Sequence, residues 1–172
     1  MTGLPRPAMT PVAERPPEMV ELEISHPRPF ICRLVVSPAE LGEVVDHVSN
    51  VEYVRWLDRA AELHADSLGY TRAFMIERGW MWFVGRHEID YRAECWLGDE
   101  ILLATWVRDM GRIKSWRDTV AWRPADGTVV MRASTLWVFV DLATRRPQRI
   151  SADVAARFDP LIPREGAPCG SG

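Results

Sequence analysis

The chain has 172 residues, which is the size of one ordinary domain and enough for a substantial hydrophobic core. Hydrophobic residues make up 47% of it and charged residues 26%, a balance typical of globular proteins and not of disordered or membrane-spanning ones. The formal net charge of −3 argues against a general nucleic-acid binder, because such proteins need a cationic surface to displace counterions from phosphate.

The N-terminal segment, residues 1–28, is rich in proline and lacks hydrophobic periodicity, which predicts a flexible arm. It has no apolar stretch of the kind found in signal peptides. No apolar run in the chain is long enough to span a bilayer, so we expect no contact with a membrane. A single domain is expected over residues 29–160, followed by a flexible tail over residues 161–172.

The three cysteines, Cys32, Cys95 and Cys169, are scattered along the chain and odd in number. Their spacing fits neither a disulfide framework nor a metal-binding knuckle. Free thiols are typical of a reducing compartment, so we expect a cytoplasmic protein.

The first regular elements expected along the chain are a short strand and a long helix. Residues 30–36 form a short apolar and β-branched run, which predicts a strand. Ser37 and Pro38 then have the pattern of a helix start, with serine as the cap and proline in the first turn. In residues 51–68, apolar side chains recur at three- and four-residue steps, which predicts a long helix that ends at Gly69. The apolar face is so wide that this helix must be covered on most of its circumference.

Four strand-like segments follow the helix, at residues 82–95, 101–110, 113–123 and 128–141. Gly98-Asp99 predicts a turn between the first two, and Asp126-Gly127 predicts a hairpin between the last two. Ser151 is a candidate cap for a final short helix. The order of one strand, a long helix and four consecutive antiparallel strands predicts an α+β domain in which a curved sheet lies against the helix.

Tryptophan is unusually frequent, with 8 residues in the chain. One explanation is packing in the core and at subunit interfaces, because tryptophan supplies much buried area and is enriched at interfaces. The other is a pocket for an aromatic or long acyl group. The sequence leaves both open.

Three ionisable residues, Glu43, Asp46 and His47, lie within five positions just before the long helix. The N-terminus of a helix carries unsatisfied N–H groups and the positive end of the helix dipole, so it can stabilise the oxyanion of an acyl-transfer reaction. A carboxylate facing it could attack a carbonyl carbon or activate a water molecule. The same pattern is also typical of an acidic capping cluster that does no chemistry. A glycine-rich phosphate loop, a nucleophile elbow and an H-E-x-x-H metal motif are all absent from the sequence.

Residues 46–58 read DHVSNVEYVRWLD, which resembles the G-H-V-N-N-x-x-Y-x-R-W-x-E segment of hotdog-fold thioesterases in the group around 4-hydroxybenzoyl-CoA thioesterase. Residues 86–100 resemble the "eidY…GDel" hairpin of that group, and residues 140–147 resemble its closing "vD…trrP". The resemblance covers residues 30–158 in the same order and with the same spacing. It implies a hotdog fold, with one long central helix wrapped by a curved antiparallel sheet of about five strands. It also implies a homodimer or homotetramer, with active sites at the dimer interface and no metal or redox cofactor.

The resemblance also implies roles for individual residues. The family's D-x-x-G-H-V element supplies an aspartate that acts as nucleophile or general base, and Glu43 stands in its place here, with Asp46 in place of the glycine. Either carboxylate can therefore be the catalytic one, and His47 is expected to orient it or a water molecule. The backbone amide near Asn50 is the expected oxyanion donor. The two aromatic positions expected near the acyl pocket and the helix packing are Tyr53 and Trp56.

We therefore predict hydrolysis of an acyl thioester, carried by coenzyme A or by an acyl carrier protein, to a free acid and a thiol. An alternative is a non-catalytic hotdog domain that binds an acyl chain or a carrier protein as a pathway accessory, which the two departures at the catalytic turn favour. A third possibility is dehydration of a hydroxyacyl thioester, but the His–Asp/Glu pair of a hydratase motif is missing from the sequence. The identity of the acyl group stays open.

Overall fold

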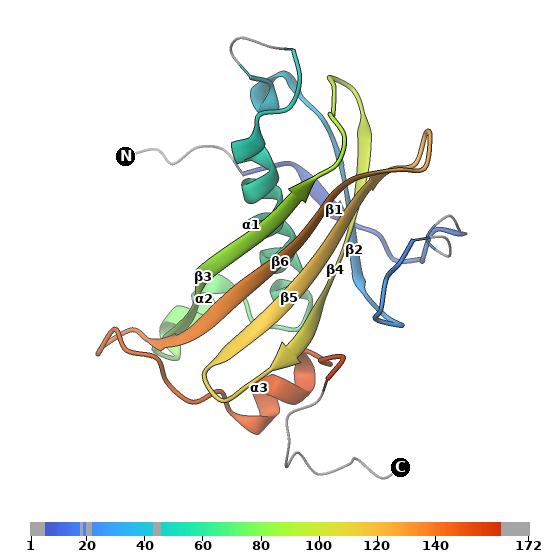
Figure 1. The fold of residues 1–172 in the computed structure, drawn as a ribbon. Coiled ribbons are helices and arrows are strands. Elements are labelled where there is room, and N and C mark those ends of the chain that lie inside the picture. The colour runs from blue at the N-terminus through green and yellow to red at the C-terminus, as the bar shows by residue number, and fades with distance from the viewer. Residues whose placement is uncertain (1–5, 18, 20–21, 43–45, 163–172) are drawn as a thin grey trace.

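A computed structural model of the chain describes residues 6–17, 19, 22–42 and 46–162. One antiparallel sheet of six strands, in the order β1-β2-β4-β5-β6-β3, curves around one long helix, α1 (Figure 1). The strands are β1 Met9–Pro11, β2 Phe30–Val35, β3 Trp80–Tyr91, β4 Glu100–Met110, β5 Lys114–Arg123 and β6 Thr128–Asp141. The helices are α1 Asn50–Ser67, α2 Arg72–Glu77 and α3 Ala152–Arg157. The predicted hotdog fold is confirmed.

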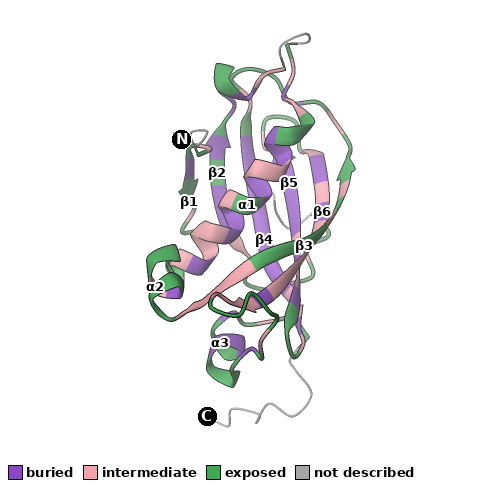
Figure 2. Ribbon diagram, turned by 90° about the vertical axis from the view of Figure 1, so that its left-hand side faces the viewer, coloured by how far each residue is buried: buried purple, intermediate pink, exposed green. Residues whose placement is uncertain are grey.

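Helix α1 forms where the three- and four-residue spacing predicted it, after the extended N-cap residue Ser49. Its end is fixed by Gly69, which has a φ of +85° and whose amide donates to the carbonyl of Asp66 at 2.9 Å. Figure 2 shows α1 against the concave side of the sheet, with buried residues where it meets the strands. Its buried face consists of Glu52, Tyr53, Trp56, Leu57, Ala60, Ala61 and Ala65.

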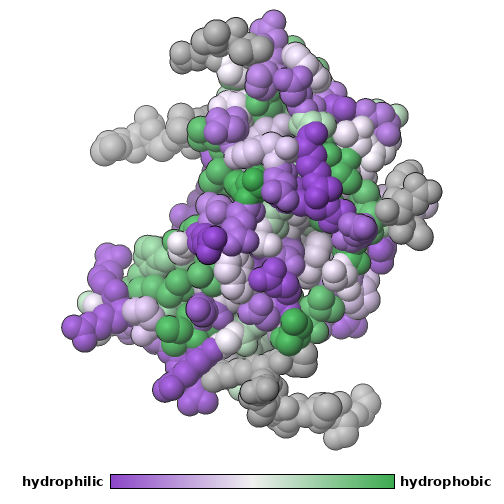
Figure 3. Space-filling model, in the orientation of Figure 1, coloured by the Kyte–Doolittle hydropathy of each residue, from purple (hydrophilic) through white to green (hydrophobic). Residues whose placement is uncertain are grey.

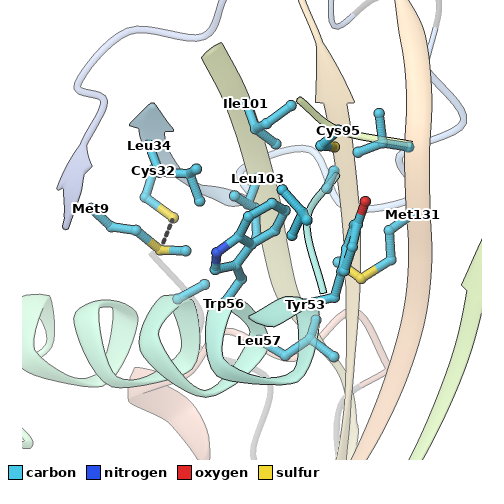
Figure 4. Close-up of a cluster of buried hydrophobic side chains, with 14 of the residues drawn as sticks. Met9, Cys32, Leu34, Tyr53, Trp56, Leu57, Cys95, Ile101, Leu103 and Met131 are labelled. Carbon is cyan, nitrogen blue, oxygen red and sulfur yellow. Dashed lines mark hydrogen bonds between the residues drawn. The ribbon is translucent and has the colours of Figure 1, made fainter. Parts of the chain in front are cut away.

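The core under the N-terminal half of α1 is built around Trp56, which is fully buried (Figure 4). Its indole Nε1 donates to Oε1 of Glu40 at 3.2 Å, and Oε2 of Glu40 accepts from the amide of Ser37 at 2.7 Å. Glu40 thereby joins the end of β2 to α1. Cys32 and Cys95 are buried as free thiols in the same cluster.

The five predicted strands are all present, but the hairpin expected between residues 82–95 and 101–110 is wrong. Both edges of β4 are occupied, one by β2 and the other by β5. Strand β3 therefore pairs with β6 at the far edge of the sheet, with Ile89 opposite Ala133. The β3–β4 connection instead crosses the start of α1, where the amide of Val48 donates to the carbonyl of Cys95 at 2.9 Å.

Part of the proline-rich N-terminal segment packs against the sheet. Strand β1, which the sequence did not predict, pairs with β2 and places Met9 opposite Leu34. Met19 is fully buried with Trp106 and Trp122, on the opposite side of the sheet from α1. The domain limits at residues 29 and 160 stay a prediction. Within the described ranges, no helix is both long and apolar enough to cross a membrane.

Candidate active site

The turn before α1 is held against the β3–β4 connection by backbone pairing. The amide of Gly42 donates to the carbonyl of His47 at 2.9 Å, and His47 forms a bridge with Trp96. Asp46, the residue before His47, is exposed, and Glu43 lies outside the described residues. The backbone thus fixes the position of His47 and leaves the side chain of Asp46 in solvent.

His47 has an unusual environment for a surface histidine. Its side chain is 34% exposed, yet its Nδ1 is enclosed and has no hydrogen-bond partner among the described residues. The nearest carboxylate oxygen is Oε1 of Glu94, at 3.8 Å from Nδ1. The ring of Trp96 lies edge-on, with centroids 6.1 Å apart. The imidazole is therefore held next to a carboxylate without a short hydrogen bond to it.

The first turn of α1 has no side-chain cap from its N-cap residue, Ser49. The side chain of Ser49 makes no capping hydrogen bond, so it does not occupy the amides at the helix start. Asn50 is exposed, and its carbonyl accepts from the hydroxyl of Tyr91 at 3.3 Å. The amide of Glu52 already donates to the carbonyl of Ser49 at 2.9 Å, so an oxyanion placed here would meet the N–H groups of Asn50 and Val51 at the positive end of the helix.

Tyr53 and Trp56, the aromatic residues expected near the acyl pocket, both belong to the core. The hydroxyl of Tyr53 donates to the carbonyl of Ala93 at 3.5 Å, and burial raises the pKa of its phenol above the ordinary value. Among the described residues, neither of them lines the cavity found beside α1. The structure therefore groups Asp46, His47 and Asn50 at the helix start and places the two aromatic residues behind them.

A cavity of about 620 Å³ lies beside the C-terminal half of α1, which is a size typical of small-molecule sites. Its walls come from α1, α2 and strands β3 to β6, and they include Met75, Met81, Trp82, Phe83, Val84, Met110, Trp137 and Phe158. Figure 3 shows apolar surface near the end of the molecule where α2 and the beginning of β3 lie. The nearest cavity residue on α1 is Asp58, about 12 Å along the helix axis from Asn50. The cavity and the helix start are thus separate within one protomer.

Arg117, on β5, also lines this cavity and was not identified from the sequence. It is 6% exposed, and its Nη1 donates to Nδ1 of His64 at 2.9 Å and to Oγ1 of Thr105 at 3.3 Å. Burial lowers the pKa of Arg117 to about 10, so the guanidinium is charged at neutral pH. Burial, assisted by the charges of Arg117 and His26, lowers the pKa of His64 to about 2, so this imidazole is neutral.

A curved antiparallel sheet wrapped around one long helix, with an uncapped helix start and an apolar cavity, defines a hotdog-fold protein with a candidate acyl-binding site. The chain belongs to the Thioesterase-like superfamily, which matches residues 40–158. In the described part of the chain, no three His, Cys, Asp or Glu side chains converge as a metal site.

Curated relatives of this chain are plant acyl carrier protein thioesterases. The chain is 27% identical over 154 residues to the chloroplastic oleoyl-acyl carrier protein thioesterase 1 of Arabidopsis thaliana, and the aligned region covers 86% of this chain and 41% of that protein. It is 29% identical over 160 residues to the chloroplastic oleoyl-acyl carrier protein thioesterase of Coriandrum sativum, and this aligned region covers 87% of this chain and 42% of that protein. The chain therefore spans about two fifths of the length of these relatives.

Solved structures with the same fold include thioesterases for two kinds of acyl carrier. The 1,4-dihydroxy-2-naphthoyl-CoA thioesterase of Synechocystis has a TM-score of 0.70 at 17% identity, covering 77% of this chain and 96% of that one. The 12:0-ACP thioesterase of Umbellularia californica has a TM-score of 0.65 at 23% identity, covering 77% of this chain and 53% of that one. At these identities the likeness establishes the fold alone.

Proposed function

We propose that this protein hydrolyses an acyl thioester of coenzyme A or an acyl carrier protein to a free acid and a thiol. The observation that carries the proposal is the grouping of Asp46 and His47 at the uncapped start of α1 in a member of the Thioesterase-like superfamily. The thioesterase names of the relatives support the same reaction class.

In the proposed reaction, the thioester carbonyl oxygen is held by the first-turn amides of α1, near Asn50. A carboxylate, either Glu43 or Asp46, attacks the carbonyl carbon or activates a water molecule that does so. The oxyanion collapses, the C–S bond breaks and the thiolate takes up a proton from the attacking water or from solvent. Where the carboxylate itself attacks, a water molecule then hydrolyses the resulting mixed anhydride, which releases the free acid and restores the carboxylate. His47 orients the carboxylate or the water, and its imidazole lies 3.8 Å from Oε1 of Glu94.

A homodimer through β3 would bring the cavity and the helix start together. Strand β3 is an edge strand of 12 residues that exposes Phe83, Val84 and Tyr91, and an unpaired apolar edge favours pairing with a second chain. In such a dimer, β3 would pair antiparallel with β3 of the second chain, about a two-fold axis normal to the sheet. The α1 helices of the two chains would then run in opposite directions. The start of that helix would then lie beside the C-terminal half of the first one, next to the cavity. Two such dimers would form the tetramer that the hotdog resemblance also allows.

The proposal is tested by incubating the purified protein with a panel of acyl-CoA and acyl carrier protein thioesters and measuring both products. Free thiol and free acid are expected in equal amounts, with the acyl group unchanged. Tight binding of an acyl thioester without thiol release would instead support the accessory binding domain. Formation of an unsaturated acyl thioester would support the dehydratase.

A further inference from the structure

Arg117 is a buried cation without a counter-ion in the described part of the chain. No carboxylate of a described residue comes within 4 Å of its guanidinium, whose hydrogen bonds go to the neutral acceptors His64 and Thr105. Both of these bonds use Nη1, and Nε and Nη2 donate to no other described residue. A charged group removed from water is costly unless it is paired, so this arrangement is typical of a site that awaits an anion.

The acidic residues of the cavity do not supply that anion. Glu62 already forms ion pairs with three arginines, Arg6 at 2.8 Å, Arg59 at 2.7 Å and Arg72 at 3.5 Å. Asp58 is exposed, and its charge acts on His87, whose pKa burial lowers and Asp58 raises. Neither carboxylate forms an ion pair with Arg117.

The remaining edge of the guanidinium has the shape that a carboxylate prefers. A carboxylate binds arginine through two parallel N–H···O bonds, and the Nε–Nη2 edge offers such a fork. His64 and Thr105 hold Nη1 on the other side and so fix the plane of the group. The rest of the wall is mostly apolar, with Trp82, Phe83, Val84 and Met110. A fitting ligand therefore has an apolar body and one acidic end.

Building on the proposed thioesterase function, we propose that the acyl group of the substrate carries a carboxylate at the end remote from the thioester, and that Arg117 binds this carboxylate. Arg117 is then the residue that selects ω-carboxyacyl thioesters over acyl thioesters with a methyl end.

The test compares ω-carboxyacyl-CoAs with methyl-ended acyl-CoAs of equal length, over a range of lengths. At the chain length that the wild-type protein hydrolyses best, we expect kcat/KM for the ω-carboxyacyl-CoA to be at least about tenfold higher than for the methyl-ended acyl-CoA. Most of this difference should come from a lower KM for the ω-carboxyacyl-CoA. Arg117→Met should abolish this preference, so that the ratio of the two kcat/KM values, measured in the same variant, falls to about one. Arg117→Lys, which keeps the charge and loses the fork, should give an intermediate ratio. Arg33→Met, on the exposed side of β2, should keep the wild-type ratio and serves as the matched control.

A binding measurement separates this inference from the proposed function. Free dicarboxylic and monocarboxylic acids of equal length are titrated while the intrinsic tryptophan fluorescence is recorded, to which Trp82 and Trp137 in the cavity wall contribute. Tighter binding of the dicarboxylic acid by wild type, and not by Arg117→Lys or Arg117→Met, would support the Arg117 site even if no thioester were hydrolysed. Hydrolysis without any preference for an ω-carboxylate over a methyl end would overturn the inference and leave the proposed function in place.

Discussion

Nη1 of Arg117 donates a 2.9 Å hydrogen bond to Nδ1 of His64, which ties the middle of β5 to α1. Since arginine can only donate, Nδ1 of His64 is the acceptor and its ring proton is on Nε2. The pair lies between the apolar cluster around Trp56 and the one around Phe139. The two halves of the core are thus joined by a polar contact that requires a neutral histidine.

This requirement predicts an acid-sensitive fold. The pKa of His64 is about 2 in the folded state and near its ordinary value of about 6.5 in the unfolded state, so below pH 6.5 the unfolded state binds an extra proton. Stability is therefore lost as the pH falls, by about 2 kcal/mol between pH 7 and pH 5 from this residue. His64→Gln keeps an acceptor for Arg117 and does not titrate. Urea unfolding at both pH values should show a smaller loss for the variant, and an equal loss would contradict the assignment.

Removal of the Glu40 side chain should destabilise the fold. Glu40→Ala leaves the buried indole N–H of Trp56 and the amide of Ser37 without their acceptor, at a cost of about 3 kcal/mol. Denaturant unfolding measures this cost. Glu77→Ala, at an exposed position of α2, is the control and should change stability by less than about 0.5 kcal/mol. A small effect of Glu40→Ala would mean that water replaces the lost carboxylate.

The dimer proposed through β3 predicts that a charge at its exposed edge weakens association. Val84→Lys places a cation where two copies of the strand would meet, so sedimentation should shift from dimer toward monomer. Val35→Lys is the matched control, because Val35 is a similarly exposed valine on β2, away from that edge. An unchanged dimer in Val84→Lys would refute the β3 interface.

His47 and Glu94 should have unequal effects on catalysis. His47→Ala removes the group that orients the carboxylate or the water, and we expect kcat to fall about 100-fold. Glu94→Gln keeps the shape but removes the charge 3.8 Å from Nδ1, and a loss of only severalfold is expected because the Glu94 side chain is 61% exposed. Steady-state kinetics with one thioester substrate measures both. Equal losses would mean that Glu94 takes part directly.

The fold could be predicted because periodicity and turn residues are local signals. The spacing of apolar residues defined α1, and Asp126-Gly127 defined the β5–β6 hairpin, where Gly127 has a φ of +70°. Strand β1 was missed because three residues ending in Pro11 carry no alternating pattern. The pairing of β3 with β6 was missed because it depends on long-range contacts that the sequence does not encode locally.

The candidate site was only partly predictable for a different reason. The motif before α1 pointed to Asp46 and His47, which the structure places together. Arg117 was missed because the first residues of β5 on the face toward α1 are the polar Ser115, Arg117 and Thr119, before the apolar Ala121, whereas alternation predicts apolar residues along the whole face. Polar residues on the neighbouring strands, Thr105 on β4 and Thr135 on β6, were the available signal for a polar band beneath the helix.

The most direct test of the account is the kcat/KM for thioester hydrolysis by Glu43→Gln and Asp46→Asn, measured beside wild type. Asp90→Asn, at an exposed carboxylate on β3, is the control and should match wild type. The account predicts that one of the first two variants loses at least about 100-fold, which identifies the catalytic carboxylate. Full activity in both variants would contradict a carboxylate-assisted site at the start of α1.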